Sequence, residues 1–337
     1  MERALLDPRC SARIVARRPM LYRDGADPAL DRPAHVRAAS SVSWLGERLA
    51  VVQDDAHFIA LVEPETGLAA SIALPAGHHD KRLFDDTRGT KRFKLDLEAC
   101  FTQHEPGRTR LLAFGSGTTP VRELVVIVDF AAVMHTVDSL RVIDASTFYA
   151  QLHALPQFIG GELNLEGALV RGDTLLLFQR GNGAMREGRP SISAVGELSW
   201  PRFEAYLEAA ASDPTLAEVP PLTQITPYDL GTIEGIAFAF TDATLTPSSG
   251  ILFLASAEAS TDSSSDGAVL GTRIGMIAAD GSARMAVLQS EEGSTSLLKA
   301  EGIVLDRVDA TRAWVVVDMD DPAAPSTLLE LRLDFPE

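Results

Sequence analysis

Cysteine and long apolar runs are both scarce in this sequence. The chain has two cysteines, Cys10 and Cys100, which are too few for a disulfide framework, so we expect a reducing, cytoplasmic compartment. It has no run of about 18 apolar residues, so we expect no membrane-spanning helix and no membrane partner. Residues 1–22 are charged and lack an apolar core, so no secretory signal is expected.

Basic residues are also few compared with acidic ones. Thirty Lys and Arg residues stand against 47 Asp and Glu residues, giving a net charge of −17. A nucleic-acid backbone needs a basic surface, so nucleic acid is excluded as a partner. An acidic surface suits cationic ligands, metal ions or solubility alone. The 46% hydrophobic and 23% charged content is that of a folded protein with a sizeable core.

One pattern recurs along the chain. An acidic residue followed by a small one interrupts apolar, strand-like segments, as in "LNLEGALV". The four pairs are spaced by 68, 68 and 67 residues and are Glu98-Ala99, Glu166-Gly167, Glu234-Gly235 and Glu301-Gly302. A fixed period of tens of residues indicates a repeat architecture.

Each pair is followed by two apolar runs with a polar turn between them, which is typical of a β-hairpin. An earlier unit starts at Ser40 without an acid and predicts a four-stranded meander over 42–45, 49–53, 58–63 and 68–74. Four strands per unit, repeated around a ring, predict an all-β fold, a β-propeller with four-stranded antiparallel blades. Short helices are expected over 146–155 and 199–212, where Ser146 and Pro201 are suitable first residues.

We expect one domain over residues 1–337, with five blades that start near residues 40, 98, 166, 234 and 301. Six blades stay open, because segments 75–93 and 129–160 are long enough to hide one more. The last unit shows only three strands, so residues 12–22 are expected to supply its fourth, outer strand and to close the ring.

The first strand of each blade lines the central channel of a propeller. Glu98, Glu166, Glu234 and Glu301 would therefore form a ring at one height, with Ser40 in the fifth position. Side chains two residues earlier share the same strand face, and they are all polar or charged: Asp96, Asn164, Thr232 and Lys299. This pattern predicts a wet or liganded channel.

Several carboxylates aimed at one axis repel one another unless a cation compensates them. Oxygen ligands without cysteine suit Ca²⁺, or Mg²⁺, better than zinc, so the four glutamates are predicted metal ligands. Two alternatives stay open. The glutamates could accept backbone N–H groups of the next blade, with each glycine permitting close approach. Basic side chains could also neutralise the ring without a metal, and the candidates are Arg37, Lys94, Arg180 and Lys299.

Other candidate site residues come from the ends of strands and from the loops over the same face. The predicted ligand-binding residues are Asn164, Arg180, Asn182, Lys299 and Asp318. The candidates for a general base are Asp54, Glu258 and, if "GHHDKRLFDD" folds over the channel mouth, His78 or His79, because histidine titrates near neutrality. Cys100 lies two residues after Glu98 and is expected to be a buried, unreactive thiol.

The repeated Glu-Gly pairs, together with "LLLFQRGN" and "GILFLASAE", resemble the phytase-like (esterase-like) β-propeller family. They are more distantly similar to the gluconolactonase-type calcium propellers. The resemblance runs from about Ser40 to Leu333 and departs from the pattern at Ser40 and Ala99. It implies that Glu98, Glu166, Glu234 and Glu301 match an axial acid position that binds Ca²⁺ or another divalent ion, and that the activity is hydrolysis of a phosphoester, ester or lactone.

Two functions therefore follow from the sequence. The first is a divalent-metal-dependent hydrolase of a small phosphoester, ester or lactone. The second is a non-catalytic propeller that binds a small polar ligand or a protein on its acidic face. A fold that serves enzymes and scaffolds alike does not decide between them. The sequence gives no indication of the oligomeric state.

Overall fold

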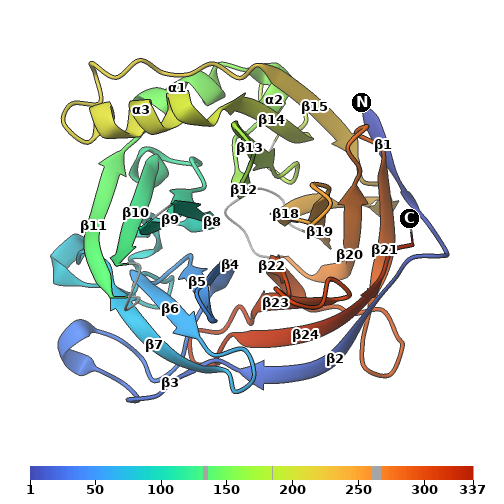
Figure 1. Cartoon of the computed structure of the whole chain (residues 1–337), viewed down its shortest axis with the longest axis horizontal. Helices are drawn as coiled ribbons and strands as arrows, with labels where there is room; N and C mark the ends of the chain where they lie inside the picture. The colour runs from blue at the N-terminus through green and yellow to red at the C-terminus, as the bar shows by residue number, and fades with distance from the viewer. Residues whose placement is uncertain (106, 132–135, 184, 260–266, 337) are drawn as a thin grey trace.

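The computed structural model describes residues 1–105, 107–131, 136–183, 185–259 and 267–336. In these residues the chain folds mainly into strands, and antiparallel meanders of four strands surround a central axis (Figure 1). This arrangement is that of a β-propeller, and the prediction of an all-β fold is confirmed.

The first two meanders follow one another directly in the chain. Their strands are β4 (Ala39–Leu45), β5 (Arg48–Gln53), β6 (Phe58–Val62) and β7 (Leu68–Ala73), then β8 (Leu97–Glu105), β9 (Arg108–Gly115), β10 (Leu124–Ala131) and β11 (Val137–Asp144). Between them lie the 3₁₀ turns η2 (His78–Asp80) and η3 (Lys91–Phe93). Segments 75–93 and 129–160, which were long enough for a further unit, form no meander of their own in the described residues.

The next two meanders are separated by a short hairpin that belongs to neither. The third consists of β12 (Leu165–Arg171), β13 (Thr174–Gln179), β14 (Ser193–Ser199) and β15 (Gln224–Asp229). The hairpin consists of β16 (Thr232–Ile233) and β17 (Ile236–Ala237). The fourth meander consists of β18 (Ala239–Leu245), β19 (Ile251–Glu258), β20 (Val269–Ile277) and β21 (Ala283–Gln289).

The last meander combines the two ends of the chain. It consists of β22 (Lys299–Leu305), β23 (Arg312–Asp318), β24 (Thr327–Asp334) and the N-terminal β2 (Ser11–Pro19), which pairs antiparallel with β24. Two further N-terminal strands bridge neighbouring meanders: β1 (Glu2–Leu6) pairs parallel with β15 and β21, and β3 (Leu21–Tyr22) pairs parallel with β7.

The inner strands β4, β8, β12, β18 and β22 lie next to one another around the axis, and β22 in turn contacts β4. In the described residues, β1 and β2 join the third, fourth and fifth meanders into one sheet by strand pairing, whereas the first and second meanders form separate sheets. Side chains also pack between neighbouring meanders. Strand β10, "LVVIVDFA", is buried at every position except Ala131, because both of its faces pack against other layers.

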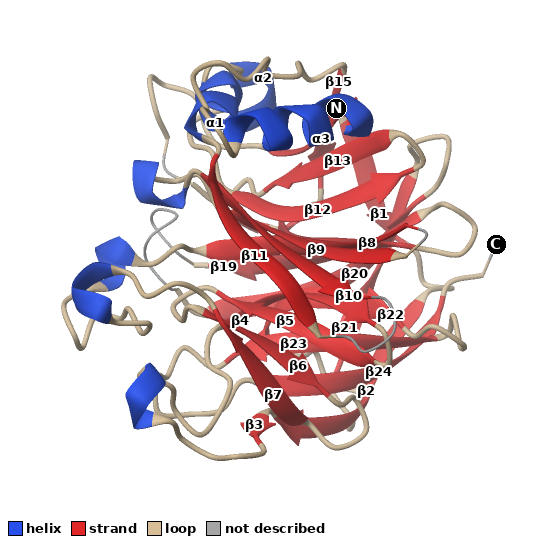
Figure 2. Cartoon of the chain, turned by 60° about the vertical axis from the view of Figure 1, so that its left-hand side comes forward, coloured by secondary structure: helices blue, strands red, loops and turns tan. Residues whose placement is uncertain are grey.

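Helices cover the outer side of the second and third meanders (Figure 2). They are α1 (Ser146–His153), α2 (Pro156–Ile159) and α3 (Trp200–Ala210), close to the two predicted ranges. Pro201 stands in the first turn of α3, and the face with Phe203 and Tyr206 packs into the core. In the described part of the chain, no helix is both long and apolar enough to span a membrane.

Candidate active site in the axial channel

Every inner strand carries a β-bulge near its start. In each case one residue is left between two paired neighbours, and these residues are Ser40, Glu98, Glu166, Thr241 and Glu301. A bulge breaks the alternation of the strand and redirects a side chain. The recurring acid in a strand-like run is therefore the bulged residue, which need not fit a regular strand.

The glycine after the acid has a steric reason in the last meander. A Cβ atom on Gly302 would lie 2.8 Å from the Cα atom of Ser41, so only glycine lets β22 approach β4 this closely. Two bulged residues are not acidic, and their hydroxyls donate to the neighbouring inner strand: Ser40 to the carbonyl of Leu97, and Thr241 to that of Ala300 at 3.0 Å.

The prediction that Glu234 belongs to this ring is wrong. Glu234 and Gly235 form the exposed turn of the β16–β17 hairpin, and Glu234 has a φ of 51°. The inner strand of the fourth meander starts at Ala239, not near residue 234, and Thr241 takes the ring position. The 68-residue spacing was coincidental there, because the hairpin displaces the strand start.

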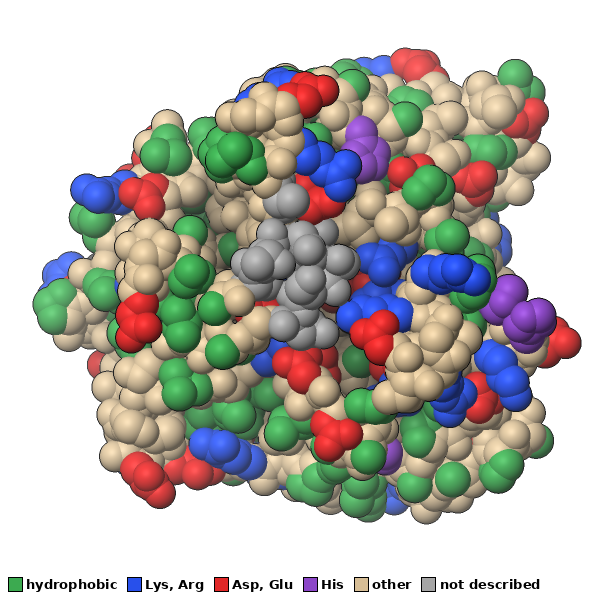
Figure 3. All heavy atoms as spheres, turned by 180° about the vertical axis from the view of Figure 1, so that it is seen from behind, with side chains coloured by type: hydrophobic (Ala, Val, Ile, Leu, Met, Phe, Trp, Pro, Cys, Tyr) green, Lys and Arg blue, Asp and Glu red, His purple; other side chains and the backbone are tan. Residues whose placement is uncertain are grey.

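A small polar cavity lies on the axis beside the ring, and we call it the axial cavity. Its described lining has seven carboxylates and five cations, so acids exceed bases by two: Asp54, Asp96, Glu98, Glu166, Glu258, Glu301, Asp318, Lys91, Lys94, Arg122, Arg180 and Lys299. Ser40, Asn164 and Asn182 also line it. Figure 3 shows acidic and basic side chains side by side around the middle of one face. The structure thus brings together every predicted site residue except Glu234 and His78.

The size of the axial cavity limits what it can hold. Its volume is about 50 Å³, whereas a single water needs about 10–15 Å³ on the same measure. An ion with a few waters fits, but a whole sugar ring does not. A second cavity of about 240 Å³, the vestibule, adjoins it and shares Asp54, Lys91, Lys94 and Asp318 with it. The remaining charged residues of the vestibule are Arg37, Asp55, Asp85, Asp86, Asp320 and Asp321.

Arg180 is the cationic centre of one side of the axial cavity. Its guanidinium lies 3.2 Å from Glu166 Oε1 and 2.7 Å from Glu258 Oε2, and 3.9 Å from Glu301 Oε2. Asn164 donates through Nδ2 to Glu166 Oε1 at 2.7 Å. Glu166 and Glu258 thus share one cationic partner within the protein.

Lys94 plays the same part on the other side. Its Nζ lies 2.7 Å from Asp54 Oδ2 and 2.6 Å from Asp96 Oδ1, while Arg122 reaches Asp96 Oδ2 at 2.9 Å. Burial alone would lower the pKa of Lys94, but the two carboxylates raise it overall, so Lys94 stays charged. Arg122 could not be predicted from the repeat pattern, because it lies in the 3₁₀ turn η4 (Pro120–Arg122) between β9 and β10.

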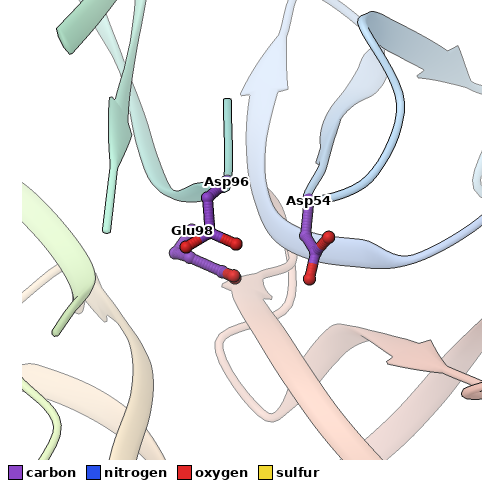
Figure 4. A group of neighbouring side chains, drawn as sticks. All are labelled: Asp54, Asp96 and Glu98. Atoms are coloured by element: carbon purple, nitrogen blue, oxygen red, sulfur yellow. The ribbon is translucent and has the colours of Figure 1, made fainter. Parts of the chain in front are cut away.

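Asp54, Asp96 and Glu98 form an acidic triad (Figure 4). One carboxylate oxygen from each lies within 4.8 Å of the others, which is a spacing that could hold a metal ion. Asp96 comes from the residue before β8, Glu98 from its bulge and Asp54 from the loop after β5. Asp54 Oδ1 is buried and has no hydrogen-bond partner among the described residues.

Burial raises the pKa of several acids in the axial cavity. It raises that of Glu98 well above its usual value, and the neighbouring Glu166 and Asp54 add to the effect. It raises the pKa of Glu166 to about 8 although Arg180 opposes it, that of Glu301 to about 7, and that of Asp318 to about 8. Strongly raised pKa values in a cavity are typical of functional sites.

Lys299 and Asn182 complete the rim. Lys299 Nζ lies 2.7 Å from Asp320 Oδ1, 3.5 Å from Asp318 Oδ2 and 3.8 Å from Glu301 Oε1. Asn182 Oδ1 and Glu301 Oε2 are buried and accept no hydrogen bond from a described donor. These two oxygens and Asp54 Oδ1 are acceptors that a ligand could satisfy.

His78 does not reach the site. Its ring stacks on Phe93 with the ring centroids 3.7 Å apart, and it lines neither cavity among the described residues. The prediction of His78 as a base is therefore wrong, because the connector packs on itself. His79 is exposed. Cys100 is buried, and burial raises the pKa of its thiol, which favours the unreactive form.

A second polar group, which we call the neck, lies deeper on the axis. Asp242, the residue after the bulged Thr241, accepts from Ser41 Oγ at 3.2 Å and from the backbone N–H of Ile303 at 2.9 Å. Ser41 Oγ in turn accepts from the N–H of Cys100 at 3.1 Å. The neck thus links β18 to β4, β8 and β22. Sequence reasoning missed Asp242, although a count back through the hairpin from "GILFLASAE" would have found the strand that carries it.

Comparison with solved structures returns proteins of similar size. The glutaminyl cyclase of Myxococcus xanthus is 9% identical with a TM-score of 0.45, covering 100% of this chain and 99% of that one. A thermostable family-43 glycoside hydrolase is 11% identical with a TM-score of 0.44, covering 90% and 92%. A luciferin-regenerating enzyme is 9% identical with a TM-score of 0.42, covering 88% and 92%. Likeness at this level carries no argument about the chemistry of this chain.

No curated protein matches the sequence, and the resemblance to phytase-like propellers is not confirmed by these comparisons. One family model matches residues 35–333, nearly the whole chain. The chain therefore belongs to the family of unknown function DUF6929.

Proposed function

We propose that the chain is a divalent-cation-dependent hydrolase of a small polar molecule, with its site in the axial cavity. The observation that carries the proposal is the acidic triad of Asp54, Asp96 and Glu98 in a cavity of about 50 Å³. The substrate classes are those named from the sequence, a phosphoester, an ester or a lactone. Such a substrate would occupy the vestibule, because the axial cavity holds little more than an ion with its waters.

The residues of the triad fit a hard cation. All donors are carboxylate oxygens, which Ca²⁺ and Mg²⁺ prefer, and Asp54 Oδ1 has no other partner in the part of the chain that the structure describes. Lys94 competes with the cation, since its ammonium contacts Asp54 and Asp96. Affinity should therefore be modest. This triad replaces the set of four glutamates predicted from the sequence, because Glu234 lies elsewhere and Glu166 is already paired with Arg180.

The remaining residues have supporting roles. A bound cation supplies Lewis acidity, which polarises the substrate and lowers the pKa of water. Glu301 is the best candidate for the general base, because its Oε2 has no described hydrogen-bond partner and its pKa is raised to about 7. Glu258 suits this role less well, because it is bonded to Arg180. Arg180 holds Glu166 and Glu258 in place. Asp318, which lines both cavities, would contact the substrate in the vestibule, and Asn182 would contact any part of it that reaches into the axial cavity.

In this proposal the meanders are the blades of a five-bladed propeller, and β2 closes the ring as the outer strand of the last blade. The pairing of β2 with β24 and the contact of β22 with β4 support it. A closed ring leaves no exposed inner edge and keeps the bulged residues at one height.

A non-catalytic binding site is the second candidate. The observation that favours it is that each described cation of the axial cavity already has a carboxylate oxygen within 3.2 Å. Such a network is stable without a metal and could bind a small polar ligand or a protein partner by hydrogen bonds alone.

A substrate screen separates the two candidates. p-Nitrophenyl phosphate, p-nitrophenyl acetate and δ-gluconolactone would be assayed with Ca²⁺, with Mg²⁺ and with EDTA. We expect turnover of at least one substrate that EDTA abolishes, that Asp96→Asn lowers at least tenfold, and that Glu234→Gln leaves unchanged. Turnover of none of them, or turnover that EDTA and Asp96→Asn leave intact, contradicts the hydrolase.

A further inference from the structure

We propose that the axial cavity and the vestibule together select a ligand with a positively charged group and further hydrogen-bond donors, and reject an anionic one. The ligand class is a small protonated amine such as an amino sugar. The inference rests on the proposed function only because both concern the same site. If both hold, the substrate is an ester or lactone that carries a positive charge.

The first support is the charge of the vestibule. Its described lining carries seven carboxylates and three cations. The three cations are already engaged: Arg37 with Asp85 at 3.0 Å, Lys91 with Asp86 at 3.2 Å, and Lys94 with Asp54 at 2.7 Å. A phosphate would enter a region with excess negative charge whose cations are all bound to carboxylates. A protonated amine is attracted to the same region.

The second support is the type of atom left without a partner. Three buried acceptor oxygens on the lining of the axial cavity lack a hydrogen bond in the described structure: Asp54 Oδ1, Asn182 Oδ1 and Glu301 Oε2. The Glu301 side chain is only 7% exposed. An unpaired buried acceptor costs free energy until a donor reaches it, so a ligand rich in donors gains what an acceptor-only phosphate loses.

Two donors on the same described lining also lack a partner among the described residues, namely the Nε atoms of Arg122 and Arg180. Both guanidinium groups are nevertheless bonded to carboxylates through a terminal nitrogen, at 2.9 Å to Asp96 and 2.7 Å to Glu258. An anion would have to compete with these carboxylates at the same guanidinium groups. The three unpaired acceptors, in contrast, have no hydrogen-bond partner in the described structure with which a ligand would have to compete.

The dimensions agree with a ligand of one ring. The vestibule offers about 240 Å³ beside the axial cavity, and the shared Asp54 and Asp318 connect the two. A hexosamine ring fits the vestibule, and its ammonium can then point at the acceptors of the axial cavity. A larger polyamine or peptide would extend beyond both.

The test uses three probes with one ring and different charge: D-glucosamine, D-glucose and D-glucose 6-phosphate. Binding to the full chain would be measured by calorimetry, once with EDTA and once with Ca²⁺. We expect D-glucosamine to bind at least tenfold more tightly than D-glucose, and D-glucose 6-phosphate to bind most weakly, in the EDTA series. Equal or tighter binding of the phosphate, or binding of none of the three, overturns the inference.

Variants locate the binding. Glu301→Gln keeps the shape of the side chain and removes its charge, and should weaken D-glucosamine at least tenfold. Asp318→Asn should do the same, and serves as the second variant if Glu301→Gln does not fold. Glu234→Gln is the matched control, because it changes the same Glu-Gly pair in an exposed turn and should leave binding unchanged. Unchanged affinity in both cavity variants contradicts the inference.

Failure of the inference and failure of the hydrolase are distinguishable. If Ca²⁺ binds and esters are cleaved but D-glucose 6-phosphate binds more tightly than D-glucosamine, only the proposed ligand selectivity is wrong. If D-glucosamine binds in EDTA and no metal binds, the selectivity stands and the metal-dependent hydrolase is wrong.

Discussion

The neck and the axial cavity both place buried acids on the inner strands, but the acids have different partners. Asp242 in the neck accepts from Ser41 and from the backbone of Ile303, groups that belong to two other meanders. Glu301 in the cavity lies near the cations Arg180 and Lys299 and near the Glu258 carboxylate, and its Oε2 has no hydrogen-bond partner among the described residues. The comparison shows that an acid on the axis can hold strands together or face a ligand, depending on whether backbone donors reach it.

The largest expected effect is in the neck. Asp242→Ala leaves the Ile303 N–H and the Ser41 hydroxyl without their buried acceptor, and should lower the free energy of unfolding by about 2–5 kcal/mol. Asp242→Asn keeps one acceptor oxygen and should cost about 1 kcal/mol or less. Urea unfolding measures both. Equal losses in the two variants would mean that the hydrogen bonds of the neck do not matter.

The second prediction concerns how the free energy of unfolding depends on pH through Glu301. Burial raises the pKa of Glu301 to about 7 from 4.5, so the folded state binds more protons than the unfolded state between these values. Stability contributed by this group is therefore lost as pH rises from about 4.5 to 7. Glu301→Gln should remove that loss, gaining about 1–3 kcal/mol relative to wild type across the interval. Unfolding curves of wild type and Glu301→Gln at pH 4.5, 6 and 7.5 test this prediction. If the free energies of unfolding of the two proteins changed in parallel with pH, the prediction would be wrong.

The smallest effect should come from the acid that belongs to neither region. Glu234 is exposed in its turn, so Glu234→Gln should change the free energy of unfolding by less than about 0.5 kcal/mol. Glutamine would adopt the same positive φ as Glu234 in this turn, so the substitution adds no backbone strain. If Glu234→Gln lowered the free energy of unfolding as much as Asp242→Ala, Glu234 would have to stabilise the axial region, which contradicts its exposed position.

The strand arrangement could be predicted from sequence because hairpins leave a clear pattern, as in "LEGALVRGDTLLLFQRGN". The β-bulges could not, since a bulge is a property of pairing and shows no fixed residue: Ser40 and Thr241 occupy the same position as Glu166. The Glu-Gly pair at 234 misled the alignment because an inserted hairpin carries the same dipeptide as the inner strands.

The grouping of the site residues around the axial cavity, with most of its acids and with Arg180 and Lys299, could be predicted because strand ends meet at one face. Its balance of charge could not, because connectors supply Lys91 and Arg122 without any repeat. The acidic triad was also missed as a group, since Asp54 and Glu98 come from different meanders and only the fold brings them within reach of one cation.

One measurement tests the central claim most directly, namely a calorimetric titration of Ca²⁺ into wild type, Glu98→Gln and Glu234→Gln. We predict one Ca²⁺ ion per chain in wild type and in Glu234→Gln, and an affinity at least tenfold weaker in Glu98→Gln. Absence of binding in wild type, or equal affinity in all three proteins, would contradict a cation site in the axial cavity.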